Sequence, residues 1–233
     1  MTRLIYMTDQ SVTKTSERRN VAVRRGRPRT AGLAAKRREE ILATATHLFA
    51  RDGFHEADMQ QLADELGLAK GTLYRYFSTK RALFLAAVDR VMMLLHTRIE
   101  EVRAKARDPL RQIGEAIQTY LTFFDAHPEF VELLVLERAV FKDRKKPTYF
   151  EHRARNIKRW QRMYSDLITT GRVRRLSTES ITDVLSSAVY GTMFTNFFAG
   201  RTKSPTAQAR QIMDIVFHGL LTDKERLRKP ELH

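Results

Sequence analysis

The sequence MQQLADELGLAKGTLYRYF, residues 59–77, has the clearest structural pattern in the chain. Apolar residues recur at helical spacing in its first part, residues 59–66, and again in its last part, residues 70–77. Gly67 lies between the two parts and can adopt the left-handed backbone conformation that a tight turn needs. Asp58 precedes the first part and is a residue type that caps helix N-termini. The pattern therefore predicts a helix-turn-helix.

The last of these helices, residues 70–77, has two different faces. Leu73 and Phe77 share one face, which we expect to pack on the preceding helices. The opposite face and its flanks carry the residues that we expect at DNA: Lys70, Gly71, Thr72, Tyr74, Arg75 and Tyr76. Glycine allows close backbone approach to the major groove, Thr and Arg reach base edges, and Lys and Tyr hold phosphates.

Helical periodicity also dominates the rest of the chain, and no convincing alternating strand pattern is present. Upstream, a helix is predicted over residues 36–51, with Gly53 as its end. Downstream, Ser78 is expected to cap a long helix that runs to about Arg107. Further helices are predicted at residues 109–126, 128–141, 149–170, 178–199 and 205–221. The expected fold is all-α: an N-terminal three-helix DNA-binding domain joined by the long fourth helix to a larger helical domain.

A basic arm precedes the first predicted helix. Residues 1–35 hold eight Lys or Arg against two Asp or Glu, and RRGRPRT at 24–30 is its densest part. The tetrapeptide RGRP resembles an AT-hook core, in which Arg25 and Arg27 would lie along the minor groove while Pro28 holds the chain extended. The alternative is a disordered tail that touches phosphates non-specifically.

Composition limits the function. A net charge of +15 indicates a polyanionic partner, with nucleic acid first and an anionic membrane second. The chain has no Cys, and no apolar run reaches the roughly 18 residues of a membrane span, so we expect a cytoplasmic protein without disulfides. The seven His are scattered without metal-ligand spacing, and no catalytic motif is recognisable. We therefore expect no catalytic residue, no metal and no cofactor.

Two stretches carry a family resemblance. ILATATHLFARDGF at 41–54 and LADELGLAKGTLYRYFSTKRALF at 62–84 resemble the DNA-binding domain of TetR-family transcriptional regulators, over about residues 36–90. The resemblance implies a homodimer that binds a pseudo-palindromic operator in double-stranded DNA. It also implies that residues 91–233 form a helical domain for dimerisation and for an unknown small-molecule effector, which in most relatives releases a repressor from DNA.

The resemblance also assigns roles to single residues. By position, Lys70, Gly71, Thr72 and Tyr74 would meet bases or adjacent phosphates, and Tyr76 and Lys80 would hold backbone phosphates. Three positions depart from the usual pattern. Tyr76 stands where His is common, Asp58 where Ser or Thr often caps, and Arg81 where an acidic residue often completes a capping box. Arg81 in exchange offers a further phosphate contact.

The C-terminal half is less informative. Its aromatic and apolar residues are either plain core or the lining of an effector pocket, for which the candidates are Phe123, Phe124, Phe130, Leu133, Trp160 and Tyr164. The apolar faces of residues 187–200 and 212–221 would pair with those of a second copy. The basic stretches KDRKK (142–146) and RARNIKRWQR (153–162) are solvated helix faces, or they attract an anionic effector such as an acyl-CoA or a carboxylate.

Three classes of function remain. The leading hypothesis is a dimeric, ligand-responsive transcriptional repressor that reads a specific sequence. The alternative is an architectural, nucleoid-associated protein in which charge dominates and sequence matters little. An all-α enzyme with a vestigial DNA-binding unit is the third class, and no motif supports it.

Overall fold

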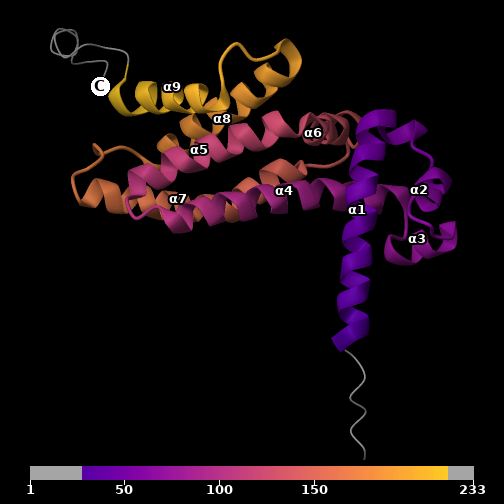
Figure 1. Ribbon diagram of the computed structural model, residues 1–233. Coiled ribbons are helices and arrows are strands. Elements are labelled where there is room, and N and C mark those ends of the chain that lie inside the picture. Colours follow the sequence, from indigo (N-terminus) through magenta and orange to yellow (C-terminus); the bar gives the residue numbers. More distant parts are fainter. Residues whose placement is uncertain (1–27, 220–233) are drawn as a thin grey trace, which may run out of the picture.

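The structure is a computed structural model that describes residues 28–219. This part of the chain folds into nine helices without a strand (Figure 1). The helices are α1 (Pro28–Glu56), α2 (Met59–Glu65), α3 (Lys70–Tyr76), α4 (Lys80–Lys105), α5 (Pro109–Ala126), α6 (Pro128–Val140), α7 (Thr148–Thr169), α8 (Thr178–Ala199) and α9 (Pro205–His218). Within residues 28–219, no helix is long and apolar enough to cross a membrane.

The helix boundaries correct three expectations. Helix α1 begins at Pro28 rather than at Lys36, so Pro28 opens a helix instead of holding an extended arm. Proline suits this position because its φ is already helical and the first N–H of a helix has no partner. The cap of α4 is Thr79 and not Ser78, because the Thr79 hydroxyl accepts from the Ala82 N–H at 3.0 Å. Helix α9 ends at His218, before the expected Leu221.

The minor-groove hypothesis concerns residues that lie outside the described part of the chain. Arg25 and Arg27 precede Pro28, so their predicted contacts with DNA stay predictions. At the other end of α1, the backbone leaves the helical conformation at Gly53, which has φ 75° and ψ 176°. This break confirms Gly53 as the point at which the long first helix stops.

The first three helices and the start of α4 share one core. Apolar side chains from all four elements are less than a tenth exposed, among them Ile41, Leu48, Phe49, Leu62, Leu73, Phe77, Leu83 and Phe84. The short α2 and α3, each seven residues long, are far below the length at which an isolated helix is stable in water. Their stability therefore depends on this shared packing.

Helix α4 belongs to both halves of the molecule. In Figure 1 it runs from the end that holds α2 and α3, past α1, to the far end, where it lies along α7. Buried residues recur along nearly its full length, from Leu83 through Val91 to Arg103. Because one continuous helix supplies core residues to both halves, neither half can rotate without disturbing the packing of α4.

An aromatic cluster joins the two halves at the start of α4. The ring of Phe141, at the end of α6, lies 4.9 Å from that of Phe54 and 5.3 Å from that of Phe84. The guanidinium of Arg81 lies 4.8 Å from the centre of the Phe141 ring and forms an ion pair with Asp143 at 2.6 Å. The first turn of α4 is thus attached to the loop between α6 and α7.

A buried carboxylate holds that loop in place. Glu137, on α6, is 1% exposed and accepts hydrogen bonds from the backbone N–H and the hydroxyl of Thr148, at 3.0 and 2.8 Å. Arg144 pairs with Glu137 at 3.1 Å and with Glu151 at 2.9 Å. Glu137 therefore caps the first turn of α7 from the neighbouring helix, and it compensates its own burial with these partners.

We predict that Glu137→Gln lowers the free energy of unfolding by about 2 kcal/mol, because the buried network loses its negative charge and one of its two acceptor oxygens. Urea denaturation of the full-length protein measures this change. The matched control is Glu132→Gln on the same helix, since Glu132 forms no hydrogen bond or ion pair within residues 28–219. Equal stability of the two variants would contradict the role given to Glu137.

Candidate DNA interface and C-terminal cavity

The turn between α2 and α3 has the geometry of a helix-turn-helix. Asp58 caps α2, its carboxylate accepting from the Gln60 N–H at 2.7 Å, which confirms the predicted cap. Gly67 has φ +61°, the left-handed conformation expected of it. The N–H groups of Gly67 and Leu68 donate to carbonyls at the end of α2, at 3.0 and 2.8 Å, so the turn is tied to the helix before it.

Helix α3 presents its polar face outward. Leu73 is 1% exposed and anchors the helix in the core, as the wheel predicts. Of the six residues expected at DNA, Lys70, Gly71, Tyr74 and Arg75 are exposed, while Thr72 and Tyr76 are partly buried. Within residues 28–219, the side chains of Lys70, Tyr74 and Arg75 form no hydrogen bond, ion pair or ring contact. The hydrogen-bond donors of these three side chains are therefore available to another molecule.

Two neighbouring cations have partners inside the protein. The Lys80 ammonium donates to the His55 carbonyl at 2.8 Å and lies 5.2 Å from the Phe54 ring centre. Partial burial lowers the pKa of Lys80. Lys80 keeps two further N–H donors, so its predicted phosphate contact stays a prediction. Arg81, for which a phosphate contact was expected, instead forms an ion pair with Asp143 and lies over the ring of Phe141. Local sequence pattern could not predict these contacts, because both partners are distant in the sequence.

The C-terminal half contains a cavity with two adjoining chambers. The chamber that we call the inner one, for its apolar lining, has a volume of about 150 Å³ and lies among α4, α5, α7 and α8. Its lining includes Trp160 and Tyr164, two of the predicted pocket residues. The outer chamber has a similar volume and shares Trp160, Tyr120 and Tyr149 with the inner one. Because desolvation disfavours phenolate, burial raises the pKa of Tyr149 to about 12 and also raises those of Tyr120 and Tyr164.

The other four pocket candidates lie elsewhere in the core. The rings of Phe123 and Phe130 are 5.3 Å apart, and both lie against His127 at the junction of α5 and α6. Phe124 borders a separate cavity of about 180 Å³ among α5, α6 and α8, and Leu133 is fully buried. Tyr120 and Tyr149, by contrast, line the cavity and were not among the candidates. Tyr120 could have been predicted as a lining residue, because it lies on the same apolar helix face as Phe123 and Phe124.

The turn, the exposed face of α3 and the helical scaffold behind them define a helix-turn-helix DNA-binding protein. Residues 41–87 match the family model described as "Bacterial regulatory proteins, tetR family". The HTH-type transcriptional activator FasR of Mycolicibacterium smegmatis is 30% identical over 118 residues, which cover 47% of this chain and 54% of FasR. The nucleoid occlusion factor SlmA of Vibrio vulnificus is 26% identical over 110 residues, which cover 47% of this chain and 56% of SlmA.

Residues 41–87 thus form a DNA-binding domain of the kind found in TetR-family transcriptional regulators. The match spans about half the length of these curated relatives. Among solved structures, the FadR of Bacillus halodurans superimposes with a TM-score of 0.68 at 15% identity, covering 79% of this chain and 96% of that one.

Two further solved structures contain ligands. The FadR of Bacillus subtilis, in complex with stearoyl-CoA, has a TM-score of 0.66 at 15% identity and covers 78% of this chain and 99% of its own. A structure from Saccharomonospora viridis in complex with choline has a TM-score of 0.66 at 19% identity and covers 81% and 99%. At such identities the likeness shows the fold alone, which agrees with the predicted all-α architecture.

Two glycines of this site allow a matched prediction. Gly67→Ala places a side chain in a left-handed conformation and should lower the free energy of unfolding by about 1–2 kcal/mol. Gly71 has an ordinary helical φ and no atom within 4 Å of an added Cβ, so Gly71→Ala should leave stability equal or higher. The Cβ at residue 71 would instead meet DNA, and operator affinity should fall about tenfold or more.

Thermal unfolding measures the first effect and a DNA-binding titration the second. If Gly71→Ala lowers the stability of the protein and leaves its DNA affinity unchanged, Gly71 does not lie at the DNA interface.

Proposed function

We propose that this protein is a dimeric transcriptional regulator that reads a specific pseudo-palindromic operator and acts as a repressor released by a small-molecule effector. The observation that carries sequence-specific binding is the exposed face of α3, where Lys70, Tyr74 and Arg75 have no partner within residues 28–219. Polar side chains without internal partners on a short, well-anchored helix suit base edges and phosphates.

Dimerisation is supported by the outer surface of α8 and α9, which lie together at one side of the molecule (Figure 1). Val184, Phe198 and Ile215 are 58%, 68% and 42% exposed there. A groove of about 450 Å³ between the two helices is lined largely by small residues, and Asn196 and Gln208 exchange two amide hydrogen bonds along it. Small residues let a second helix pair approach closely, which favours a two-fold dimer through this face.

Effector release is supported by the position of the cavity. Its lining includes residues of α4, such as Ile99, and the same helix begins directly after α3. A ligand that fits one orientation of α4 better than another would shift the population toward that orientation. In a dimer, this shift changes the separation of the two α3 helices and so the fit to the operator.

The alternative is an architectural role in which sequence matters little. The likeness to SlmA, a nucleoid occlusion factor, and the net charge of +15 favour it. In vitro selection of random duplex DNA with the full-length protein, near physiological salt, separates the two. A recovered palindrome supports the operator-specific regulator. A steep salt dependence without any enriched sequence supports the architectural role.

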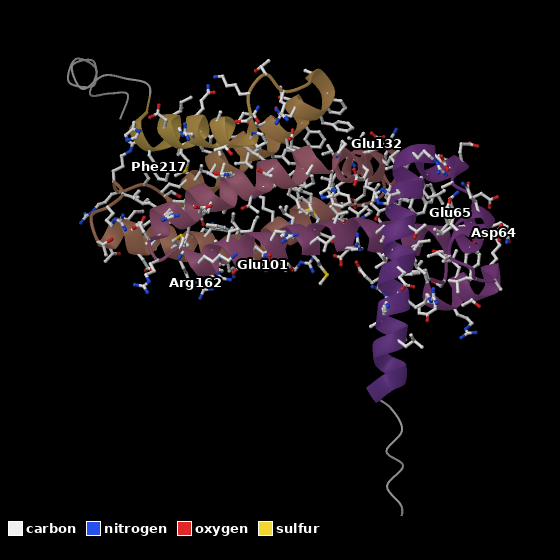
Figure 2. All side chains as sticks on the ribbon, viewed as in Figure 1. Asp64, Glu65, Glu101, Glu132, Arg162 and Phe217 are labelled. Atoms are coloured by element: carbon white, nitrogen blue, oxygen red, sulfur yellow. The ribbon has the colours of Figure 1, made fainter. Side chains whose placement is uncertain are left out.

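We predict that Arg75→Ala weakens binding to the selected operator about 10–100-fold while changing binding to random DNA much less, since a base contact is lost. Fluorescence anisotropy with both DNAs gives the specificity ratio. The control is Arg162→Ala, which removes the same charge from an exposed position of α7 at the opposite end of the molecule (Figure 2). An unchanged ratio for Arg75→Ala would count against base reading.

We further predict that Ile215→Arg converts the dimer to a monomer, because a charge would be buried at the proposed interface between copies. Sedimentation velocity reports the change in mass. Met93→Arg is the control, since Met93 is also an exposed apolar residue, 58% exposed against 42% for Ile215, and lies on α4. A dimer that survives Ile215→Arg but not Met93→Arg would place the interface elsewhere.

A further inference from the structure

The two chambers of the C-terminal cavity differ in chemistry. No charged side chain lines the inner chamber, whose walls come mainly from Ile113, Ile117, Leu185 and Val189, together with the tyrosines and Trp160. The outer chamber is lined by two arginines, two histidines and one glutamate: Arg153, Arg159, His96, His152 and Glu100. A single molecule that occupies both chambers therefore needs an apolar body and a polar head.

The polar groups of the inner chamber limit what the apolar body can carry. The hydroxyls of Thr182 and Ser186 already donate to carbonyls of their own helix, at 2.9 and 2.5 Å. The hydroxyl of Tyr164 has no hydrogen-bond partner within residues 28–219, although this residue is 2% exposed. The chamber opens to the surface, and its volume near 150 Å³ equals that of a protein cavity that holds benzene. The inner chamber thus fits one aromatic ring or a branched alkyl group of that size.

The outer chamber favours an anion. Arg159 pairs with Glu100 at 2.6 Å, and its side chain is 54% exposed. The imidazole of His96 makes no hydrogen bond or ion pair within residues 28–219 and adds a donor at the same wall. Asp183, the partner of Arg153, is two-thirds exposed. Each of the two pairs has one partner that is 28% exposed and one that is more than half exposed. Ion pairs that reach solvent in this way contribute little to stability, so a ligand carboxylate can replace these protein carboxylates at small cost.

Glu100 has a second cationic partner, which lowers the cost of moving Arg159 from Glu100 to a ligand. Its carboxylate also binds Arg103 at 2.6 Å, and the Arg103 side chain is 7% exposed and stacks over Trp160 at 4.7 Å. When Arg159 turns to a ligand, Glu100 therefore keeps a cationic partner and no charge is left alone. Arg103 in turn occupies a face of Trp160, which reduces the space for a ligand cation over that ring.

We propose that this cavity binds a small organic carboxylate whose apolar body, about the size of one aromatic ring, fills the inner chamber and whose carboxylate pairs with Arg159 and His96 in the outer one. This inference names the ligand class for the effector site of the proposed function, on which it rests. Binding moves Arg159, on α7, away from Glu100, on α4. The ligand thereby removes one of the ion pairs that hold α4 against α7.

The test uses the full-length protein without DNA. Isothermal titration calorimetry measures binding of benzoate, phenylacetate, 3-phenylpropionate and 4-methylpentanoate, each beside its neutral amide and its corresponding amine. We expect at least one carboxylate to bind about tenfold or more tightly than its amide, because a charge-assisted hydrogen bond is gained. The amines should bind more weakly still, since the outer chamber is cationic.

Variants separate this site from non-specific attraction to a basic protein. Arg159→Gln should reduce carboxylate affinity to that of the amide and leave the amide unchanged, whereas Arg162→Gln, at an exposed position on the same helix, should change neither. Val189→Phe should abolish binding of both by filling the inner chamber. Absence of binding by all four carboxylates, preference for the amide or the amine, or indifference to Arg159→Gln would overturn the proposal.

Failure of this inference can be distinguished from failure of the proposed function. If a carboxylate binds as described but leaves operator affinity unchanged, the proposed ligand class is supported and effector release is not. If an operator is selected but no carboxylate binds, the DNA-binding regulator is supported and the ligand class is not.

Discussion

The ring of Phe84 packs between the helices of the N-terminal half and those of the C-terminal half. This ring is fully buried in the first turns of α4 and lies 5.1 Å from Phe49, 5.5 Å from Phe54 and 5.3 Å from Phe141. Its neighbours come from α1 and from the end of α6, so one side chain contacts the DNA-binding helices and the C-terminal helices together. Two of these three contacts are edge-to-face. Because the rings are close-packed, a movement of α4 is felt by helices of both halves.

Sequence pattern predicted the helices well, because the signals that end and begin helices are local. Asp58, Gly67 and the prolines that open α5, α6 and α9 act within a few residues of themselves. The errors also have local causes. Ser78 and Thr79 are adjacent and both belong to residue types that cap helices, so the pattern does not decide between them, and in the structure Thr79 is the cap. The first turns of α1 lack an apolar stripe, so periodicity could not extend the helix back to Pro28.

The cavity was much less predictable than α3. The outward face of α3 follows from one helix and its period, whereas the cavity lining comes from four helices whose apolar residues look alike in sequence. Phe123 and Leu133 are as apolar as Ile113 and Leu185, yet the first two lie in the filled core and the last two line the chamber. What distinguishes them is the register between helices, and register is a property of packing that no single segment contains.

Net charge does not show how the positive charges of the C-terminal half are used. Residues 91–233 hold 25 Lys or Arg against 17 Asp or Glu. Some of the arginines form ion pairs between neighbouring elements, as in the pairs of Arg153 with Asp183, Arg172 with Asp108 and Arg201 with Asp125. Such pairs serve packing and leave the excess of positive charge unchanged. On α3, Lys70 and Arg75 form no ion pair within residues 28–219, so their position is more informative about DNA than the net charge.

Only three residues separate α3 from α4: Phe77, Ser78 and Thr79. Because this connection is so short, α3 moves together with the N-terminal end of α4. The 26 residues of α4 span about 39 Å at 1.5 Å per residue, so a tilt of about 5° around the cavity end would carry α3 through roughly 3 Å. That displacement is comparable to the length of a hydrogen bond to a base edge. A small tilt of α4 is therefore enough to break the proposed hydrogen bonds between α3 and the bases.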